Sequence, residues 1–176
     1  TPLEWDERAG LFLKWENQQI TGSFKLRGAL NKVSSLQDWE RQRGLVAASA
    51  GNHGQGVALA ARESGSPVTV FASRRAVPAK LSAMSALGAD VRLVEGGYAE
   101  AESAAVDFAR ENELVFISPY NDAQVIAGQA SVTAGFYGID FQHGRFSCRA
   151  HADPADFTDL RHAGNQFLQV HSPIPR

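Results

Sequence analysis

Short apolar runs alternate with alanine-rich segments along the first two thirds of the chain. The runs lie at 11–13, 45–48, 68–71, 91–94 and 114–117. Between them, residues 54–63, 78–87 and 98–112 carry apolar side chains at helical spacing. Pro78 suits the first position of a helix and Gly88 suits its C-terminal cap. A strand–helix alternation with a period of about twenty residues predicts an α/β fold, an open parallel sheet with flanking helices.

This alternation ends near Gly135. The remaining segment holds four of the five histidines and the lone Cys148 but no lysine. Its histidines are eight to eleven residues apart, which matches no metal-ligand pattern, so we expect no metal site. We therefore divide the chain into a βα part, residues 1–134, and a divergent, irregular tail, residues 135–176.

Composition narrows the class of protein. The 176 residues are 44% hydrophobic and 20% charged, as in ordinary globular proteins. A formal charge of −2 and a pI near 6.2 give no basis for binding nucleic acid or an anionic membrane, and no apolar run is long enough to span a bilayer. A single cysteine is compatible with a cytoplasmic protein. The first residue is Thr1 rather than methionine, so we expect a segment to have been lost upstream.

The first candidate chemical motif spans residues 21–29. Thr21 or Ser23 can cap a helix that begins near Phe24, and Lys25 then lies in the first turn of that helix. The positive end of the helix dipole disfavours a charged ammonium there, which suits an amine that forms an imine. A solvated lysine is the alternative, but glycines on both sides of Lys25 favour close approach of a ligand.

The second candidate motif is the glycine-rich segment 48–56, which connects a predicted strand to a predicted helix. In an open parallel sheet this position is the carboxyl edge, where ligands bind. Gly51, Gly54 and Gly56 expose backbone N–H groups, and the helix N-terminus that follows attracts anions. The segment can therefore hold a carboxylate or a phosphate, or it is a plain tight turn. His53 is either a general base or a structural hydrogen-bond donor.

Segments 14–29 (KWENQQITGSFKLRGA) and 49–56 (SAGNHGQG) together resemble the threonine dehydratase and serine racemase group of fold-type II pyridoxal-phosphate enzymes. Residues 1–3, 88–90, 119–122 and 125–129 are similar to further landmarks of this family, and the resemblance covers about residues 1–133. It implies a pyridoxal 5'-phosphate-dependent ammonia-lyase. Such an enzyme converts a small hydroxy amino acid, threonine or serine, to a 2-oxo acid and ammonia.

The resemblance also implies roles for individual residues. Lys25 would hold the cofactor as a Schiff base and move the Cα proton. Asn52 would hydrogen-bond the ring hydroxyl of the cofactor, and Phe24 would pack against the ring. The substrate carboxylate would be held by the loop of Ser49, Ala50, Gly51, Asn52 and His53. Related racemases have a serine where this chain has Ala50, so dehydration is favoured over a serine racemase-like activity.

The chain also departs from the family pattern. The family binds the cofactor phosphate with a later glycine-rich loop, whereas Gly135 and Gly138 are isolated. The serine or threonine that meets the pyridine nitrogen, and the acidic metal ligands of some members, have no counterparts. We therefore expect the tail after Thr133 to be an altered or out-of-frame continuation, with most of the cofactor domain missing. The sheet of such an incomplete fold has unpaired edges, which favour association. We therefore consider a homo-oligomer as well as a monomer.

Two other functions compete with the enzyme hypothesis. One is a catalytically incompetent fragment or remnant that keeps Lys25 but lacks the phosphate-binding loop. The other is a nucleotide-binding βα module built on residues 51–56. The nucleotide hypothesis is disfavoured because no Walker-type lysine or acidic ribose ligand lies at the required spacing.

Overall fold

The computed structural model describes residues 1–6, 8, 11–132, 138–139 and 148–149. The chain forms two compact units, Thr1–Thr133 and Ala134–Arg176. In the second unit, β7 (Gly138–Ile139) pairs antiparallel with β8 (Cys148–Arg149). The predictions made for the histidines and for the irregular course of the tail lie outside the described residues.

A four-stranded parallel sheet forms the centre of the first unit. It contains β3 (Leu45–Ala48), β4 (Val68–Ser73), β5 (Asp90–Val94) and β6 (Val115–Phe116), in the order β5-β4-β3-β6. The predicted open parallel sheet is therefore confirmed. Each predicted strand is present, and β6 is shorter than the run at 114–117 suggested.

The apolar run at 11–13 belongs to a different sheet, which corrects its interpretation as one more strand of the βα alternation. Strand β2 (Leu11–Lys14) pairs antiparallel with β1 (Leu3–Asp6) in a separate two-stranded ribbon. The short 3-10 helix η1 (Glu16–Gln18) follows β2 almost directly. A parallel partner needs a crossover connection of a dozen or more residues, whereas an antiparallel partner does not.

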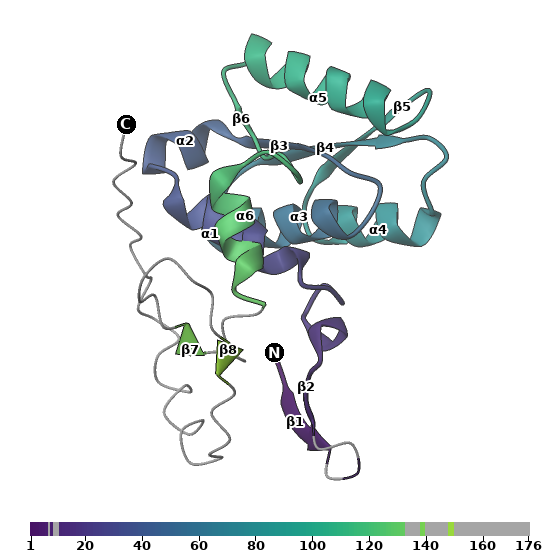
Figure 1. Cartoon of the computed structure of the whole chain (residues 1–176). Helices are drawn as coiled ribbons and strands as arrows, with labels where there is room; N and C mark the ends of the chain where they lie inside the picture. Colours follow the sequence, from purple (N-terminus) through teal and green to yellow (C-terminus); the bar gives the residue numbers. More distant parts are fainter. Residues whose placement is uncertain (7, 9–10, 133–137, 140–147, 150–176) are drawn as a thin grey trace. The chain divides into compact units, whose positions relative to one another are not determined.

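The helices of the first unit cover both faces of the central sheet (Figure 1). They are α1 (Lys25–Ser35), α2 (Asp38–Arg43), α3 (Asn52–Ser64), α4 (Pro78–Ala86), α5 (Tyr98–Glu111) and α6 (Ala123–Ala130). Helix α5 lies on one face of the sheet, and α3 and α4 lie on the other (Figure 1). None of the helices in the described ranges is long and apolar enough to cross a membrane.

Side chains of β3 alternate between two hydrophobic cores. Leu45 and Ala47 join the larger core with α1, α3 and Met84, whereas Val46 and Ala48 join the core under α5. Burial on both faces explains why β3 reads as a continuous apolar run. Alanines on the inner side of α5 allow that helix to approach the sheet closely.

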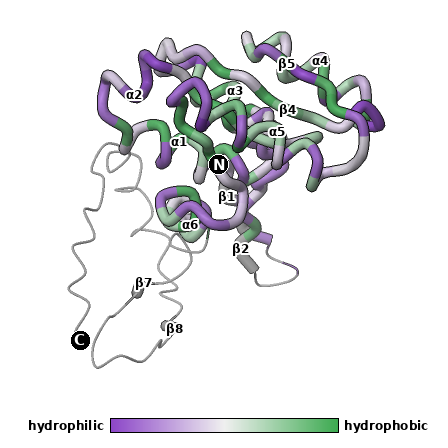
Figure 2. Tube along the Cα trace, turned by 90° about the horizontal axis from the view of Figure 1, so that it is seen from above, coloured by the Kyte–Doolittle hydropathy of each residue, from purple (hydrophilic) through white to green (hydrophobic). Residues whose placement is uncertain are grey.

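Two helices were not expected from the apolar pattern. Helix α2 is short and largely hydrophilic (Figure 2), and at its start the Glu40 carboxylate accepts a hydrogen bond from the Gln37 backbone N–H at 2.7 Å. Helix α6 begins after Asp122, whose carboxylate accepts hydrogen bonds from the N–H groups of Gln124 and Val125 at 2.9 and 3.2 Å. Both helices are defined by their caps rather than by an amphipathic period.

Candidate active site

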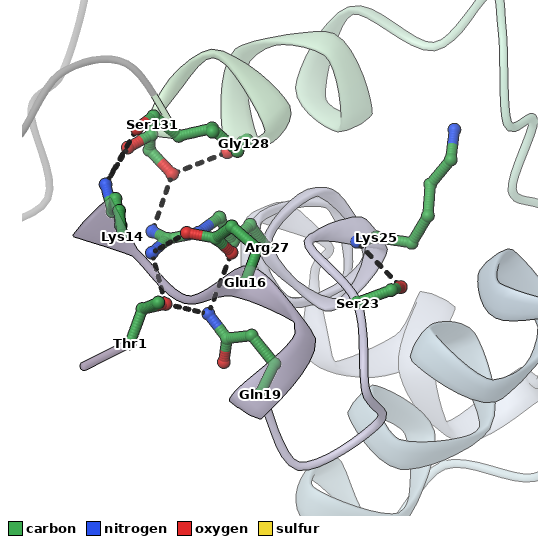
Figure 3. Close-up of polar contacts among 10 residues, drawn as sticks. Thr1, Lys14, Glu16, Gln19, Ser23, Lys25, Arg27, Gly128 and Ser131 are labelled. Atoms are coloured by element: carbon green, nitrogen blue, oxygen red, sulfur yellow. Dashed lines mark hydrogen bonds and ion pairs between the residues drawn. The ribbon is translucent and has the colours of Figure 1, made fainter. Parts of the chain in front are cut away.

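Lys25 is the first residue of α1, in the turn predicted for it. The Ser23 hydroxyl accepts a hydrogen bond from the Lys25 backbone N–H at 3.3 Å, whereas the buried Thr21 hydroxyl has no partner among the described residues. The Lys25 ammonium lies 5.5 Å from the centroid of the Phe24 ring, which is 40% exposed. Figure 3 shows the Lys25 side chain extending away from the neighbouring polar cluster. The Lys25 amine and the exposed Phe24 ring therefore lie close together at the start of α1.

The loop at the carboxyl end of β3 has its own internal support. The Ser49 N–H donates to the Phe71 carbonyl at 2.9 Å, and the Ser49 hydroxyl accepts from the Gly51 N–H at 3.1 Å. Gly51 precedes α3, and no side chain in the described part of the chain caps the N-terminus of that helix. The first-turn N–H groups of α3 are therefore left to bind an anion.

Gly56 joins the lysine motif to this loop. A Cβ atom on Gly56 would lie 3.2 Å from the Lys25 carbonyl oxygen and 3.3 Å from backbone atoms of Leu26. The absence of a side chain at Gly56 thus lets the first turn of α1 approach α3 one turn after Asn52. Two segments separated by some twenty residues in sequence form one site.

His53 is buried and holds a fixed hydrogen bond. Its Nε2 atom lies 3.0 Å from the Ile117 carbonyl oxygen, and its Nδ1 atom has no partner among the described residues. Burial lowers the pKa of His53, and the nearby charge of Lys25 lowers it further. The neutral ring donates from Nε2 to Ile117, which leaves Nδ1 with a lone pair and no proton. This geometry favours a structural hydrogen-bond donor over a general base.

Sequence reasoning missed Lys80, which comes from the first turn of α4. Its ammonium lies 3.5 Å from the Asn52 side-chain oxygen and 3.4 Å from the position that a Cβ atom would take on Gly51. No glycine pattern marks this lysine. The available signal was its place in a first helical turn that contains no acidic residue.

Glu16 is the centre of a polar cluster (Figure 3). Arg27 donates to both of its carboxylate oxygens at 3.0 Å, and also to the hydroxyls of Ser131 at 3.1 Å and Thr1 at 2.6 Å. Burial alone would raise the pKa of Glu16. Hydrogen bonds from Arg27 and Gln19, with the charges of Arg27 and Lys14, nevertheless hold this pKa below its usual range.

Lys14 connects the same cluster to the end of α6. Its ammonium donates to the carbonyl oxygens of Ser131 at 3.1 Å and Val132 at 2.8 Å, the two residues that follow the last turn of α6. Burial lowers the pKa of Lys14, and the charge of Arg27 acts in the same direction. The cluster thereby ties β2, α1 and the C-terminus of α6 together behind the candidate site.

Helix α6 packs directly on α1. A Cβ atom on Gly128 would lie 2.6 Å from the Arg27 carbonyl oxygen and 2.7 Å from the Gly28 Cα atom, so the two backbones touch. An ion pair between Lys32 and Asp122, 2.9 Å long, connects the same two helices. The helix that begins with Lys25 is therefore held between α3 on one side and α6 on another.

The described residues fit part of a pyridoxal-phosphate site. Neither Lys25 nor Lys80 takes part in an ion pair within the described ranges, so both cations are available to a ligand. The uncapped N-terminus of α3 and the Asn52 amide add hydrogen-bond donors. Across the described residues, no group of three or more histidine, cysteine or acidic side chains could hold a metal ion.

Comparison with known proteins gives consistent results. The family model described as "Pyridoxal-phosphate dependent enzyme" matches residues 1–144. The chain is 49% identical over 122 residues to an L-threonine ammonia-lyase of Thermotoga maritima, a match that covers 69% of the chain and 30% of that protein. It is 42% identical over 125 residues to a catabolic L-threonine dehydratase of Staphylococcus aureus, covering 71% of the chain and 36% of that protein.

Solved structures give the same fold. The processed form of threonine deaminase isoform 2 from Solanum lycopersicum matches with a TM-score of 0.71 and 36% identity over 76% of this chain and 40% of that one. Maize serine racemase matches with a TM-score of 0.71 and 31% identity over 76% and 43%. These matches confirm the resemblance read from the sequence. The chain spans about a third of the length of the curated relatives it matches.

Proposed function

Because this chain belongs to the pyridoxal-phosphate dependent enzyme family, we propose that it acts on threonine or serine as a dehydratase-like ammonia-lyase. The reaction would eliminate water and then take up water when the resulting imine hydrolyses, so the net products are a 2-oxo acid and ammonia. The observation that carries this proposal is the close contact between the start of α1 and α3 at Gly56. That contact brings the Lys25 motif and the anion-binding loop into one site.

Lys25 is the residue proposed to bind the cofactor and to move the Cα proton. Its amine lies beside the face of Phe24, and it has no carboxylate partner among the described residues to hold it as a fixed cation. When bound, pyridoxal phosphate supplies an electron sink for the charge that develops at Cα. Phe24 would pack against the cofactor ring, and the Asn52 amide would donate to the ring hydroxyl.

The loop from Ser49 to His53 is proposed to hold the substrate carboxylate. Uncapped N–H groups at the N-terminus of α3 favour a negative charge there. The Ser49 hydroxyl already accepts from the Gly51 N–H, so its own proton is free to donate to a carboxylate oxygen. Ala50 and Gly51 contribute backbone only. His53 keeps the first turn of α3 fixed through Ile117.

Ala50 supports elimination over racemisation. A racemase needs a second proton-transferring group on the face of Cα opposite to the lysine. Ala50 has no hydroxyl, and it is exposed at the loop position where related racemases carry a serine. A serine racemase-like activity is therefore the second candidate, and it predicts D-serine from L-serine.

Activity measurements test the proposal directly. The purified chain is incubated with pyridoxal phosphate and L-threonine or L-serine, and the 2-oxo acid and ammonia are quantified together. We expect both products from the wild-type chain and neither from Lys25→Ala. D-Serine without a 2-oxo acid would instead support the racemase function. Absence of all products would support the non-catalytic remnant.

The remaining parts of the proposal concern partners and location. The ligand is a small amino acid, bound where the described residues place donors and cations. A homo-oligomer is consistent with the position of β5 at an edge of the sheet, where β4 is its one partner strand among the described residues. A cytoplasmic location is consistent with the single cysteine in the sequence.

A further inference from the structure

Lys80 contacts the candidate site but has no part in the roles proposed so far. It is half-buried, it belongs to a different helix from the other site residues, and its ammonium lies 3.5 Å from the Asn52 side-chain oxygen. We propose that Lys80 is a positioning residue, which orients the Asn52 amide so that its NH₂ group faces the ligand. This inference rests on the proposed function for the identity of the ligand.

The hydrogen-bonding chemistry of lysine determines which end of the Asn52 amide faces Lys80. A lysine ammonium has three donors and no acceptor, so it can pair only with the oxygen end of an amide. Asn52 is exposed at the first position of α3 and would otherwise present either end to a ligand. With its oxygen turned to Lys80, the amide offers only N–H donors. The site then selects a ligand atom that accepts hydrogen bonds, such as a phenolate oxygen.

The Lys80 side chain passes close to Gly51 on its way to Asn52. The Nζ and Cδ atoms of Lys80 would lie 3.4 and 3.7 Å from a Cβ atom on Gly51. The side chain therefore crosses the loop directly over Gly51. A larger residue at this position would crowd the ammonium and move it away from Asn52. The absence of a side chain at Gly51 therefore leaves room for the Lys80 side chain.

The charge of the Lys80 ammonium is placed unfavourably within its own helix. Lys80 lies in the first turn of α4, at the positive end of the helix dipole, where a cation is unfavourable. Among the residues that the structure describes, it forms no ion pair that would offset this cost. An anionic oxygen bound beside Asn52 would supply the missing partner. At 3.5 Å the contact between Lys80 and Asn52 is long for a hydrogen bond, and we expect it to shorten when that oxygen binds.

The first test uses the side-chain amide of Asn52 in the cofactor-free chain. Lys80→Met removes the charge at similar length, Lys80→Arg restores a donor, and Arg75→Met removes an exposed charge from the loop before α4. In ¹H–¹⁵N spectra we expect the Asn52 NH₂ resonances to move in Lys80→Met, to return toward wild type in Lys80→Arg and to stay in place in Arg75→Met. Unmoved Asn52 resonances in Lys80→Met would overturn the proposal. Equal far-UV circular dichroism would show that the variants fold.

The second test measures affinity for pyridoxal phosphate by fluorescence titration. We expect Lys80→Met to weaken binding about tenfold, the factor that one charge-assisted hydrogen bond accounts for. Arg75→Met should bind as wild type does. An unchanged affinity in Lys80→Met would also overturn the proposal. If the wild-type chain binds no cofactor, the proposed function fails, while the Asn52 resonances still decide the role of Lys80.

Discussion

The carbonyl oxygen of Lys25 lies 3.2 Å from the position that a Cβ atom would occupy on Gly56. The first turn of α1 and the second turn of α3 are therefore in backbone contact, and the missing side chain at Gly56 sets the separation between these two helices. Because both helices pack on the same core, this contact cannot relax without moving one of them.

Gly56→Ala should push these two turns apart. The added methyl group meets backbone atoms of Lys25 and Leu26 rather than a flexible side chain, so we expect a loss of about 1–3 kcal/mol in the free energy of unfolding. Affinity for pyridoxal phosphate should fall as well. Urea denaturation and cofactor titration measure the two effects.

Gly97→Ala is the matched control for that substitution. Gly97 has an ordinary negative φ, and a Cβ atom there would meet only the Glu100 carboxylate at 3.5 Å. Gly97 is the N-cap of α5, where alanine is less favoured than glycine, but alanine also restricts the unfolded chain. We therefore expect a net loss of no more than about 0.5 kcal/mol. If Gly56→Ala is as stable as Gly97→Ala, a methyl group at residue 56 does not clash with the backbone of α1, which would contradict the close contact between α1 and α3.

Arg27→Lys should weaken the cluster behind the site. The planar guanidinium donates to both oxygens of Glu16 and to two hydroxyls, a pattern that one ammonium cannot reproduce. We expect the free energy of unfolding to fall by about 1–2 kcal/mol. Thermal and urea unfolding provide the measurement.

Arg62→Lys serves as its control, because the Arg62–Glu63 ion pair is exposed. An exposed pair contributes little, so the change should stay within about 0.5 kcal/mol. Equal effects of the two substitutions would argue that Arg27 makes no special contribution to the fold.

His53 should make stability depend on pH in a defined direction. Burial and the charge of Lys25 place its pKa below 6.5 in the folded protein. The unfolded chain therefore takes up a proton first as the pH falls, so the stabilisation is full above 6.5 and declines below it. His53→Gln should remove this part of the pH dependence, measured as the difference in Tm between variant and wild type across about pH 5–7. A difference that is constant with pH would contradict the burial of a neutral His53.

Sequence reasoning predicted those parts of the fold that depend on local pattern. A continuous apolar run identified β3 because a parallel strand covered on both faces is apolar throughout. The valine-containing runs at 68–71 and 91–94 identified β4 and β5 by their strand propensity. The run at 11–13 was assigned to the wrong sheet because apolar pattern does not distinguish a hairpin from a crossover strand. Helices α2 and α6 were missed because caps rather than periodicity define them.

The candidate site was predictable only in part for a related reason. Motifs identified Lys25 and the loop at residues 49–53, each of which is local in sequence. Lys80 and the Glu16–Arg27 pair depend on contacts between segments that are distant in sequence. The spacing of residue types within one segment does not reveal such contacts. Only the packing of α4 on α3 brings Lys80 to Asn52.

Covalent trapping tests the central claim, that Lys25 is the residue that binds pyridoxal phosphate. The wild-type chain is mixed with one equivalent of cofactor, reduced with borohydride, digested and analysed by mass spectrometry. Lys25→Ala and Lys80→Met are treated in parallel. We expect a cofactor label on Lys25 in the wild-type chain and none at any lysine in Lys25→Ala. A label on another lysine, or an unlabelled Lys25, would contradict it.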